Sequence, residues 1–270
     1  MTFSERHFFT FDETFFLKSL HFIFLFVFCA VSAQQNLAFD SLKLKDAKDV
    51  MIDDYGNIYI YKDKDFSFTK FDSTGQQKGK LMFTLPFKIQ SVQNPLSIPC
   101  FSENAQELKF YDQNLNEIQT INFRQKFGFV KMVYAEDLQQ IWLLDESTKR
   151  LIQYNFREDK IMNSYPVNID FENVTDFLVF NSQIYLLSKT QLMVYNFQGS
   201  KISEFPLLEG KRFRRENNNL LAIGKNTVHL LRDSVLKIIF TAENSQIVDK
   251  NSAAYFVISA NKLYLYPLNK

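Results

Sequence analysis

The chain has 270 residues with a formal net charge of +1, and 46% of its residues are hydrophobic, which is ample for a buried core. The balanced charge excludes the clustered positive excess that a nucleic-acid-binding protein needs and offers no polybasic patch for a membrane surface. The 30 Phe and 12 Tyr residues favour strands, whereas 7 Gly and 6 Pro leave most turns to Asn, Asp, Ser and Lys.

The first segment, residues 1–33, is typical of a signal peptide with an upstream extension. Lys18 precedes the apolar run LHFIFLFVFCAV, and Val31, Ser32 and Ala33 form a cleavage site before Gln34. The run is about a dozen residues long, whereas a membrane-spanning helix needs about 20. We therefore expect export to the periplasm, the outer membrane or the medium, and no transmembrane domain after cleavage. An uncleaved N-terminal anchor is the alternative, and the acidic, aromatic residues 1–17 suggest a start codon downstream of Met1.

A repeat begins in the stretch DDYGNIYIYKDKDFSFTKFDSTG, which starts at Asp53. Similar apolar strands that end in an aromatic or aliphatic residue recur about every 40 residues. A second apolar strand precedes each of them at the same period. The ends of the later strands are Phe71, Tyr111, Tyr154, Tyr195, Leu231 and Tyr266, and the corresponding positions of the earlier strands are Ile58, Ile98, Ile141, Ile184, Leu220 and Tyr255.

Each unit carries four strands, as expected for one blade of a β-propeller. Outer fourth strands follow as QKGKLMFTL, EIQTINF, KIMNSYPV, KISEFPL and VLKIIF, so the sixth unit lacks its own. The N-terminal segment NLAFDSLKL can supply it and remove an exposed sheet edge. The sequence thus predicts an all-β, six-bladed propeller of four-stranded antiparallel blades over residues 34–270, with the ring closed by an N-terminal strand.

The first unit resembles the blades of the NHL family of six-bladed propellers. The matching positions are an Asp, a Gly-Asn turn, an aliphatic and aromatic strand, and a later Asp-x-x-Gly, here Asp53, Gly56, Asn57, 58–61, Asp72 and Gly75. The fourth unit matches in part, through Asn196 and Gly199. Because these motifs are structural and such propellers serve as protein-binding, ligand-binding or hydrolytic scaffolds, the resemblance implies the fold and no particular activity.

Acidic and amide residues occupy the turns between the first and second strands of several units. Carboxylates from different blades could surround a hard cation such as calcium, whose oxygen ligands need no fixed spacing in sequence. The alternative is that Asp and Asn stand there because they tolerate turn geometry. Similarity in blade count to lactone-hydrolysing propellers implies a divalent cation held by Glu, Asn and Asp, and the residues that would serve are Glu136, Asn217 and Asp249.

One basic cluster, EGKRFRRENNN, falls on the first strand of the fifth unit. Strand alternation puts Arg212 and Arg214 on the face opposite Phe213 and Arg215. A guanidinium pair of this kind can bind a carboxylate, a phosphate or a sulfated glycan. The alternative is ion pairing with carboxylates of the neighbouring unit, for example Asp176.

Other chemically active residues are sparse. Beyond residue 33, Cys100 is the single cysteine and His229 the single histidine, so no internal disulfide can form and no Ser-His-Asp or Cys-His system is predicted. Trp142 stands where related units have Tyr59 and Tyr185, and we expect it to pack between blades rather than bind sugar.

These features predict an exported, non-enzymatic scaffold that binds a protein or glycan of the cell envelope, either as a monomer or within a hetero-assembly. The alternative is a metal-dependent hydrolase, similar to a lactonase, with a divalent cation in the central channel. Arg212 and Arg214 are the candidate ligand-binding residues of the scaffold.

Overall fold

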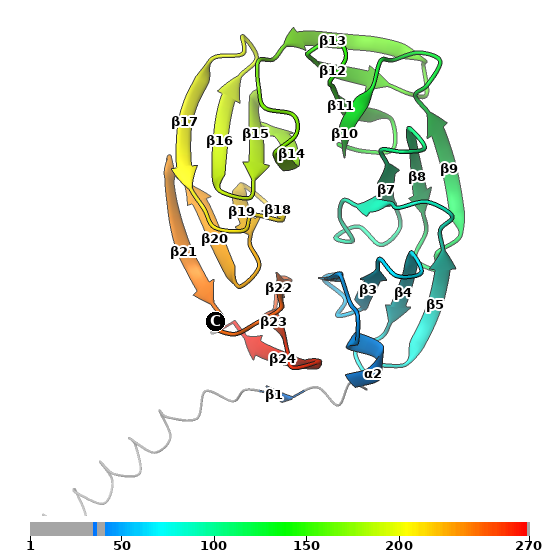
Figure 1. Ribbon diagram of the computed structural model, residues 1–270, viewed down its shortest axis with the longest axis vertical. Helices are drawn as coiled ribbons and strands as arrows, with labels where there is room; N and C mark the ends of the chain where they lie inside the picture. Colours follow the sequence, from blue (N-terminus) through cyan, green and yellow to red (C-terminus); the bar gives the residue numbers. More distant parts are fainter. Residues whose placement is uncertain (1–34, 37–40, 269–270) are drawn as a thin grey trace, which may run out of the picture. The chain divides into compact units, whose positions relative to one another are not determined.

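The computed structural model describes residues 35–36 and 41–268 and arranges them as six antiparallel sheets of four strands in a ring (Figure 1). The predicted six-bladed propeller is therefore confirmed. The signal peptide expected at residues 1–33 lies outside the described residues. Within the described part of the chain, no helix has the length and apolar character needed to cross a membrane.

The first five blades each take four strands in chain order from the channel outward. Their strands are β2 (Asp49–Ile52), β3 (Ile58–Lys62), β4 (Ser67–Phe71) and β5 (Gln77–Met82) in blade 1; β6 (Lys88–Ile89), β7 (Ile98–Ser102), β8 (Glu107–Tyr111) and β9 (Glu117–Asn122) in blade 2; β10 (Val130–Ala135), β11 (Gln140–Asp145), β12 (Arg150–Asn155) and β13 (Lys160–Pro166) in blade 3; β14 (Val174–Phe180), β15 (Gln183–Ser188), β16 (Gln191–Asn196) and β17 (Lys201–Pro206) in blade 4; and β18 (Arg212–Glu216), β19 (Asn219–Ile223), β20 (Thr227–Arg232) and β21 (Val235–Thr241) in blade 5.

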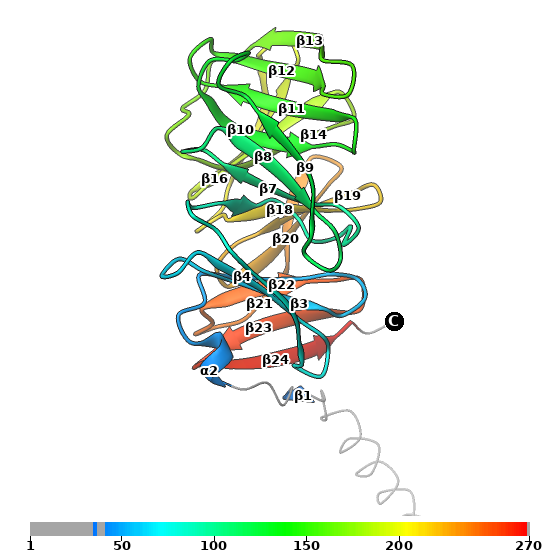
Figure 2. The same ribbon diagram turned by 90° about the vertical axis from the view of Figure 1, so that its right-hand side faces the viewer.

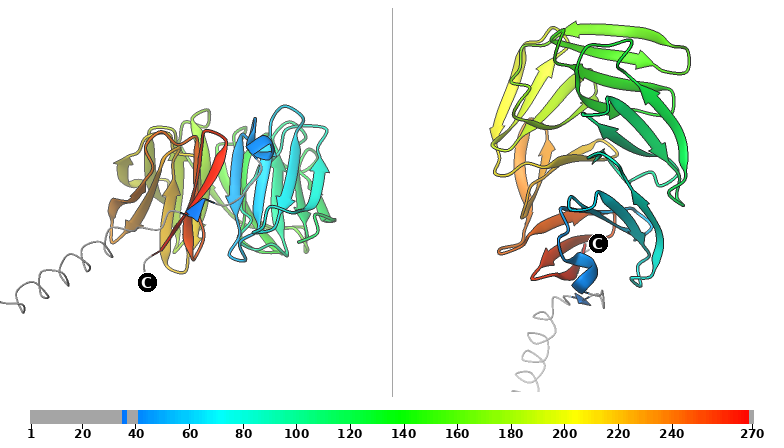
Figure 3. Two further views of the ribbon diagram at one scale, coloured as in Figure 1. Left: turned by 90° about the horizontal axis from the view of Figure 1, so that it is seen from below. Right: turned by 45° about the vertical axis from the view of Figure 1, so that its right-hand side comes forward.

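Blade 6 closes the ring with both ends of the propeller. It contains β22 (Ile247–Lys250), β23 (Ala254–Ser259), β24 (Lys262–Pro267) and β1 (Gln35–Asn36). Strand β1 pairs antiparallel with β24, with Gln35 opposite Leu265, which confirms closure by an N-terminal strand. Figure 3 shows this last blade, in orange and red, beside the blue first blade.

The predicted extent of that N-terminal strand is wrong. Ser41–Leu44 form a short helix, α2, beside β24 instead of continuing the strand (Figure 2). Leu44 is 2% exposed and packs with Ile52 and Ile258 in the core between blades 1 and 6. An outer edge strand would have left Leu44 at the rim, so burial of this one side chain favours the helical turn.

The core consists of apolar layers between neighbouring blades. In most blades the second strand is the most buried, as in β7 of blade 2, whose five residues are all buried. The outer strands alternate between exposed and half-buried residues, as in β5, which agrees with the period of two in their sequences. The fold thus places the inner strands around the channel, where side chains of different blades meet.

Repeated turns between the third and fourth strands explain the Asp-x-x-Gly motif. Oδ1 of Asp72 accepts hydrogen bonds from the backbone N–H groups of Thr74 and Gln76 at 3.0 and 2.9 Å, and Gly75 adopts a φ of 81°. In blade 4, Asn196 accepts from the N–H of Ser200 at 2.9 Å. The side-chain oxygen closes the turn, and the glycine supplies its left-handed backbone.

Candidate functional site

Arg212, on the inner strand β18, reaches across the ring to blades 6 and 1. Its Nη1 donates to both carboxylate oxygens of Asp49, at 2.7 and 2.8 Å. Its Nη2 donates to the carbonyl oxygen of Val50 at 2.9 Å and lies 3.0 Å from Oδ1 of Asp249. Burial alone would lower the pKa of Arg212, but Asp249 and Asp49 raise it well above its usual value. Arg212 therefore stays charged and joins three blades.

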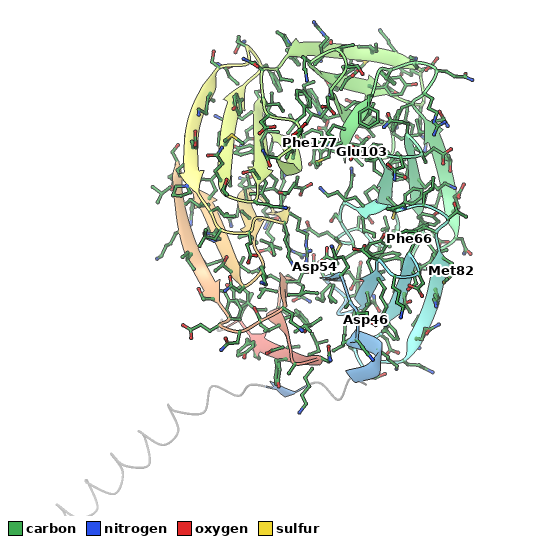
Figure 4. The ribbon with its side chains drawn as sticks, viewed as in Figure 1. Asp46, Asp54, Phe66, Met82, Glu103 and Phe177 are labelled. Atoms are coloured by element: carbon green, nitrogen blue, oxygen red, sulfur yellow. The ribbon has the colours of Figure 1, made fainter. Side chains whose placement is uncertain are left out.

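Arg214, two positions further along β18, is bound in a similar way. It is 5% exposed, its Nε donates to Oε1 of Glu216 at 2.9 Å, and its Nη2 donates to Oδ1 of Asp54 at 2.7 Å. Lys250 on β22 donates to both oxygens of Glu216 at 2.7 Å. Figure 4 shows Asp54 on the inner side of the ring. We call these seven side chains the ionic cluster: Asp49, Asp54, Arg212, Arg214, Glu216, Asp249 and Lys250.

The contacts of Arg212 and Arg214 are the blade-to-blade ion pairs that the sequence offered as the alternative to ligand binding. The partner suggested for Arg212 is different, however. Asp176 pairs with Lys88 of blade 2 at 2.7 Å and accepts the backbone N–H of Phe213 at 2.7 Å. Asp176 therefore joins blades 2, 4 and 5, as Arg212 joins blades 5, 6 and 1.

The three proposed metal ligands lie at separate places with different partners. Asp249 accepts the backbone N–H of Ile52 at 2.7 Å in addition to pairing with Arg212. Glu136 accepts the indole N–H of Trp142 at 2.9 Å, and Asn217 stands in the turn between β18 and β19 with a φ of 55°. Among the described residues, no group of three or more His, Cys, Asp or Glu side chains is arranged to hold a metal ion.

A cavity of about 610 Å³ opens at the end of the channel where the inner strands finish. We call it the turn-face cavity. Burial raises the pKa of Tyr134 in its wall, while the nearby Arg215 lowers it. Arg215 also stacks over the ring of Phe180, 3.9 Å from its centroid. The lining consists of Gln90, Ser91, Gln93, Asn94, Ser97, Pro99 and Phe110 from blade 2, residues 133–139 from blade 3, residues 176–178 from blade 4, and Phe213 and Arg215 from blade 5.

Polar and apolar groups together form the rim of the turn-face cavity. Glu136 and Gln139 come from blade 3, and Gln93 donates from its side chain to the carbonyl oxygen of Arg215 at 2.8 Å. Leu96, in the loop between β6 and β7 that contributes to the lining, is 63% exposed. Figure 4 shows Phe177, which lines the same cavity, on the inner side of β14. The arrangement can bind a ligand that carries both hydrogen-bonding groups and apolar groups.

Trp142 packs between blades, as expected from the sequence. It is buried among residues of blades 3 and 4, and its ring stacks on Phe197 of blade 4 with centroids 5.6 Å apart. Its N–H bonds Glu136 at the rim of the turn-face cavity, so it also positions that carboxylate.

Sequence reasoning missed Lys88 and Gln90, which join blade 2 to blades 4 and 3, respectively. Lys88 crosses to Asp176, and Gln90 bonds the backbone of Val133 and Ala135 in β10. Strand β6 has only two residues, so its repeat signal is weak, although a lysine on an inner strand is itself a signal for a buried partner.

A second cavity, of about 660 Å³, opens where the inner strands begin. We call it the lysine cavity. Its basic residues are Lys48, Lys88, Lys131, Lys189, Lys211, Arg212 and Lys225, and its acidic residues are Asp49, Asp63, Glu103 and Glu209.

No known family matches the chain by sequence, and no curated protein does. The structure is similar to a streptogramin B lyase, with 11% identity, a TM-score of 0.52 and coverage of 87% of this chain and 97% of that one. It is also similar to virginiamycin B lyase from Staphylococcus aureus, at 10% identity and a TM-score of 0.51, covering 87% and 98%. BamB from Moraxella catarrhalis matches at 12% identity and a TM-score of 0.45, covering 82% and 84%. The two lyases show that the chain shares the β-propeller fold, and membership of the NHL family stays a prediction.

Proposed function

We propose that the chain is an exported, non-enzymatic β-propeller that binds a protein of the cell envelope at the turn-face cavity. The observation that supports this most strongly is that the polar groups of the ionic cluster and those of the cavity rim have different partners. The members of the ionic cluster bind one another across blades, whereas the rim of the turn-face cavity presents polar side chains beside the exposed Leu96.

The apolar rim favours a protein over a glycan as the partner. Leu96 is 63% exposed, and Tyr55, in the turn after β2 on the same face, is 79% exposed. Exposed apolar and aromatic residues on the face that carries a cavity are typical of protein interfaces. The export part of the proposal rests on the apolar run and the small residues at 31–33.

Peptide display and glycan arrays with the chain from Gln34 onward test the choice of partner. We expect selected peptides to bind the unmodified protein and Met82→Asp, a matched change on the outer strand β5 where Met82 is 60% exposed. Leu96→Asp should weaken the same peptides about tenfold or more, because a charge would replace an apolar contact. Selective glycan binding that depends on Leu96 would replace the protein partner by a sugar. Peptides that bind all three proteins equally would rule out the turn-face cavity.

Thermal unfolding tests the alternative, a metal-dependent hydrolase with Glu136, Asn217 and Asp249 as ligands. Calcium, magnesium, zinc and a chelator would be compared on the same protein. The scaffold proposal expects no change in Tm beyond about 1 °C. A rise of several degrees that the chelator reverses would support the hydrolase instead, and Asp249→Asn should then abolish it.

A further inference from the structure

The lysine cavity carries more positive than negative charge. Its lining has six lysines and Arg212, against Asp49, Asp63, Glu103 and Glu209. The inner strands of a propeller run in parallel, and this cavity is lined by their beginnings, for example Lys131 before Met132 in β10. It therefore lies at the opposite end of the channel from the turn-face cavity, and a ligand bound there would be independent of the proposed function.

Most of these cations already have a carboxylate partner. The pairs are Lys48 with Asp63 at 3.1 Å, Lys88 with Asp176 at 2.7 Å, Lys131 with Glu103 at 2.8 Å, Arg212 with Asp49 at 2.7 Å, and Lys225 with Glu209 at 3.6 Å. The ammonium groups of Lys189 and Lys211 are different. In the described ranges, neither makes a hydrogen bond or an ion pair. The excess charge of the cavity thus resides in these two residues.

Backbone contacts bring together the two segments that carry Lys189 and Lys211. The N–H of Gly210 donates to the carbonyl oxygen of Lys189 at 3.2 Å, so the loop before β18 lies against the turn between β15 and β16. A Cβ at Gly210 would lie 2.4 Å from the carbonyl oxygen of Ser188, which explains why this position has no side chain. The hydroxyl of Ser188 accepts the N–H of Gln191 at 3.1 Å and fixes the turn. Hydrogen bonds therefore fix the backbone of the two segments that carry these lysines.

The environment of Lys211 disfavours its charge while the cavity holds no anion. Burial lowers the pKa of Lys211 more than the nearby Asp49 and Glu209 raise it, and Arg212 lowers it further. A bound anion would offset this effect by pairing with the ammonium group. A monovalent carboxylate could compensate only one of the two lysines, whereas a phosphate monoester carries about −1.5 to −2 at neutral pH.

We propose that the lysine cavity binds a small phosphate monoester and that Lys189 and Lys211 bind its phosphoryl group. Two ammonium groups on the wall of one cavity match the charge of one phosphoryl group. The volume of about 660 Å³ lies within the range of small-molecule sites and leaves room for the organic part of an ester. Buried residues of the wall, including Met51, Phe87 and Met132, offer apolar surface to that part.

Calorimetric titration and amide NMR test this with phenyl phosphate, inorganic phosphate and phenol at constant ionic strength. We expect phenyl phosphate to bind more tightly than inorganic phosphate, phenol not to bind, and the amide signals of Gly210 and Lys211 to shift. The double variant Lys189→Gln/Lys211→Gln should bind phenyl phosphate at least about tenfold more weakly, because charge-assisted hydrogen bonds are lost.

Lys160→Gln/Lys237→Gln is the matched control, since it removes the same charge from the exposed outer strands β13 and β21. It should keep the affinity of the unmodified chain. Equal weakening in both double variants would overturn the proposal in favour of general electrostatic attraction. Inorganic phosphate binding as tightly as the ester would overturn the assignment of an ester. Failure of phenyl phosphate to bind a folded protein at millimolar concentration would overturn the site itself.

Discussion

Two junctions between blades of this propeller are built in different ways. Between blades 3 and 4, Trp142, Phe177 and Leu186 form an apolar layer, and Tyr165 stacks on Phe197 with ring centroids 4.4 Å apart. Where blades 5, 6 and 1 meet, the inner strands are joined by the ionic cluster, in which Arg212, Arg214, Asp249 and Lys250 are buried. Apolar layers also pack between blades 6 and 1 and between blades 5 and 6. The closing junction therefore adds directional ion pairs to the dispersion and burial that both junctions share.

The ion pairs occur at the junction where the ring closes. Blade 6 obtains its outer strand from the N-terminus, so blades 5, 6 and 1 must assemble from residues far apart in the chain, such as Arg212 and Asp49. An apolar contact tolerates small displacements, whereas a bidentate guanidinium–carboxylate pair requires one relative position. Buried ion pairs add little net stability compared with apolar packing, so we infer that the ionic cluster specifies the position of closure.

The largest expected effect comes from removing the central guanidinium. Arg212→Met leaves Asp49 and Asp249 without their shared cation, and we expect a loss of about 3–5 kcal/mol in the free energy of unfolding measured in urea. Arg215→Met is the control, because Arg215 is exposed on the same strand and should cost less than about 1 kcal/mol. A loss below that value for Arg212→Met would mean that water already compensates the two carboxylates, and the contrast between the junctions would disappear.

The apolar junction is tested by Trp142→Phe, which keeps a ring but removes the hydrogen bond to Glu136. We expect a loss of about 2 kcal/mol, from a charge-assisted hydrogen bond and part of the stacked area. Tyr185→Phe at the equivalent position of blade 4 removes a hydroxyl that donates to Gln183 at 2.7 Å, and should cost about 1 kcal/mol or less. Equal losses in the two variants would show that the bond to Glu136 contributes nothing specific.

Removal of β1 tests how much the outer edge of blade 6 contributes to closure of the ring. A chain that starts at Leu37 lacks both residues that pair with β24, and we expect a loss of about 1–2 kcal/mol together with self-association through the freed edge. Analytical ultracentrifugation of the two chains measures the association. A shortened chain that stays monomeric and equally stable would show that α2, through Leu44, is sufficient to close the ring.

The sequence predicts the blades well because their signals are local. Strand alternation, turn residues such as Asp72 and Gly75, and a constant period are all readable along the chain. Counting the outer strands along the sequence also revealed that the sixth unit lacks its own. The helix at Ser41–Leu44 was not predictable in this way, because only burial of Leu44 against blades 1 and 6 decides between helix and strand there.

Partners of charged residues depend on closure of the ring rather than on local sequence. Arg212 and Asp49 are 163 positions apart and meet only because the ring closes, and nothing local distinguishes Asp49 from Asp176 as the partner. The proximity of Lys189 and Lys211 depends on Gly210 approaching the backbone of Ser188. Sequence therefore identified the basic cluster of blade 5, but the pairing within the ring decides which of its cations is available to a ligand.

The smallest effect is expected at the turns between third and fourth strands, which do not depend on the type of junction. In blade 2, the N–H of Asn116 donates to Asp112 and lowers the pKa of that carboxyl group, with further contributions from the side chain of Asn116 and the N–H of Asn114. Because the pKa is lower in the folded chain, the ionised carboxylate stabilises the fold fully above the unfolded-state pKa, near 4. This contribution is lost as the pH falls through the lower folded-state pKa.

An NMR titration of the Asp112 carboxyl group, combined with unfolding between pH 2 and about 6, measures this contribution. Asp112→Asn keeps an acceptor oxygen for the turn but has no charge to titrate, so its stability should fall less steeply in acid than that of the unmodified chain. Asp72→Asn in blade 1 should likewise lose stability less steeply in acid. Hydrogen bonds from the turn lower the pKa of the carboxyl group at both positions, and Lys78 lowers that of Asp72 as well. Blade 1 also contributes Asp49 and Asp54 to the ionic cluster. If the two substitutions changed the acid sensitivity of stability in opposite directions, the ionic cluster would influence the outer turns of blade 1. The junctions would then differ in their whole electrostatic environment rather than in their inner strands alone.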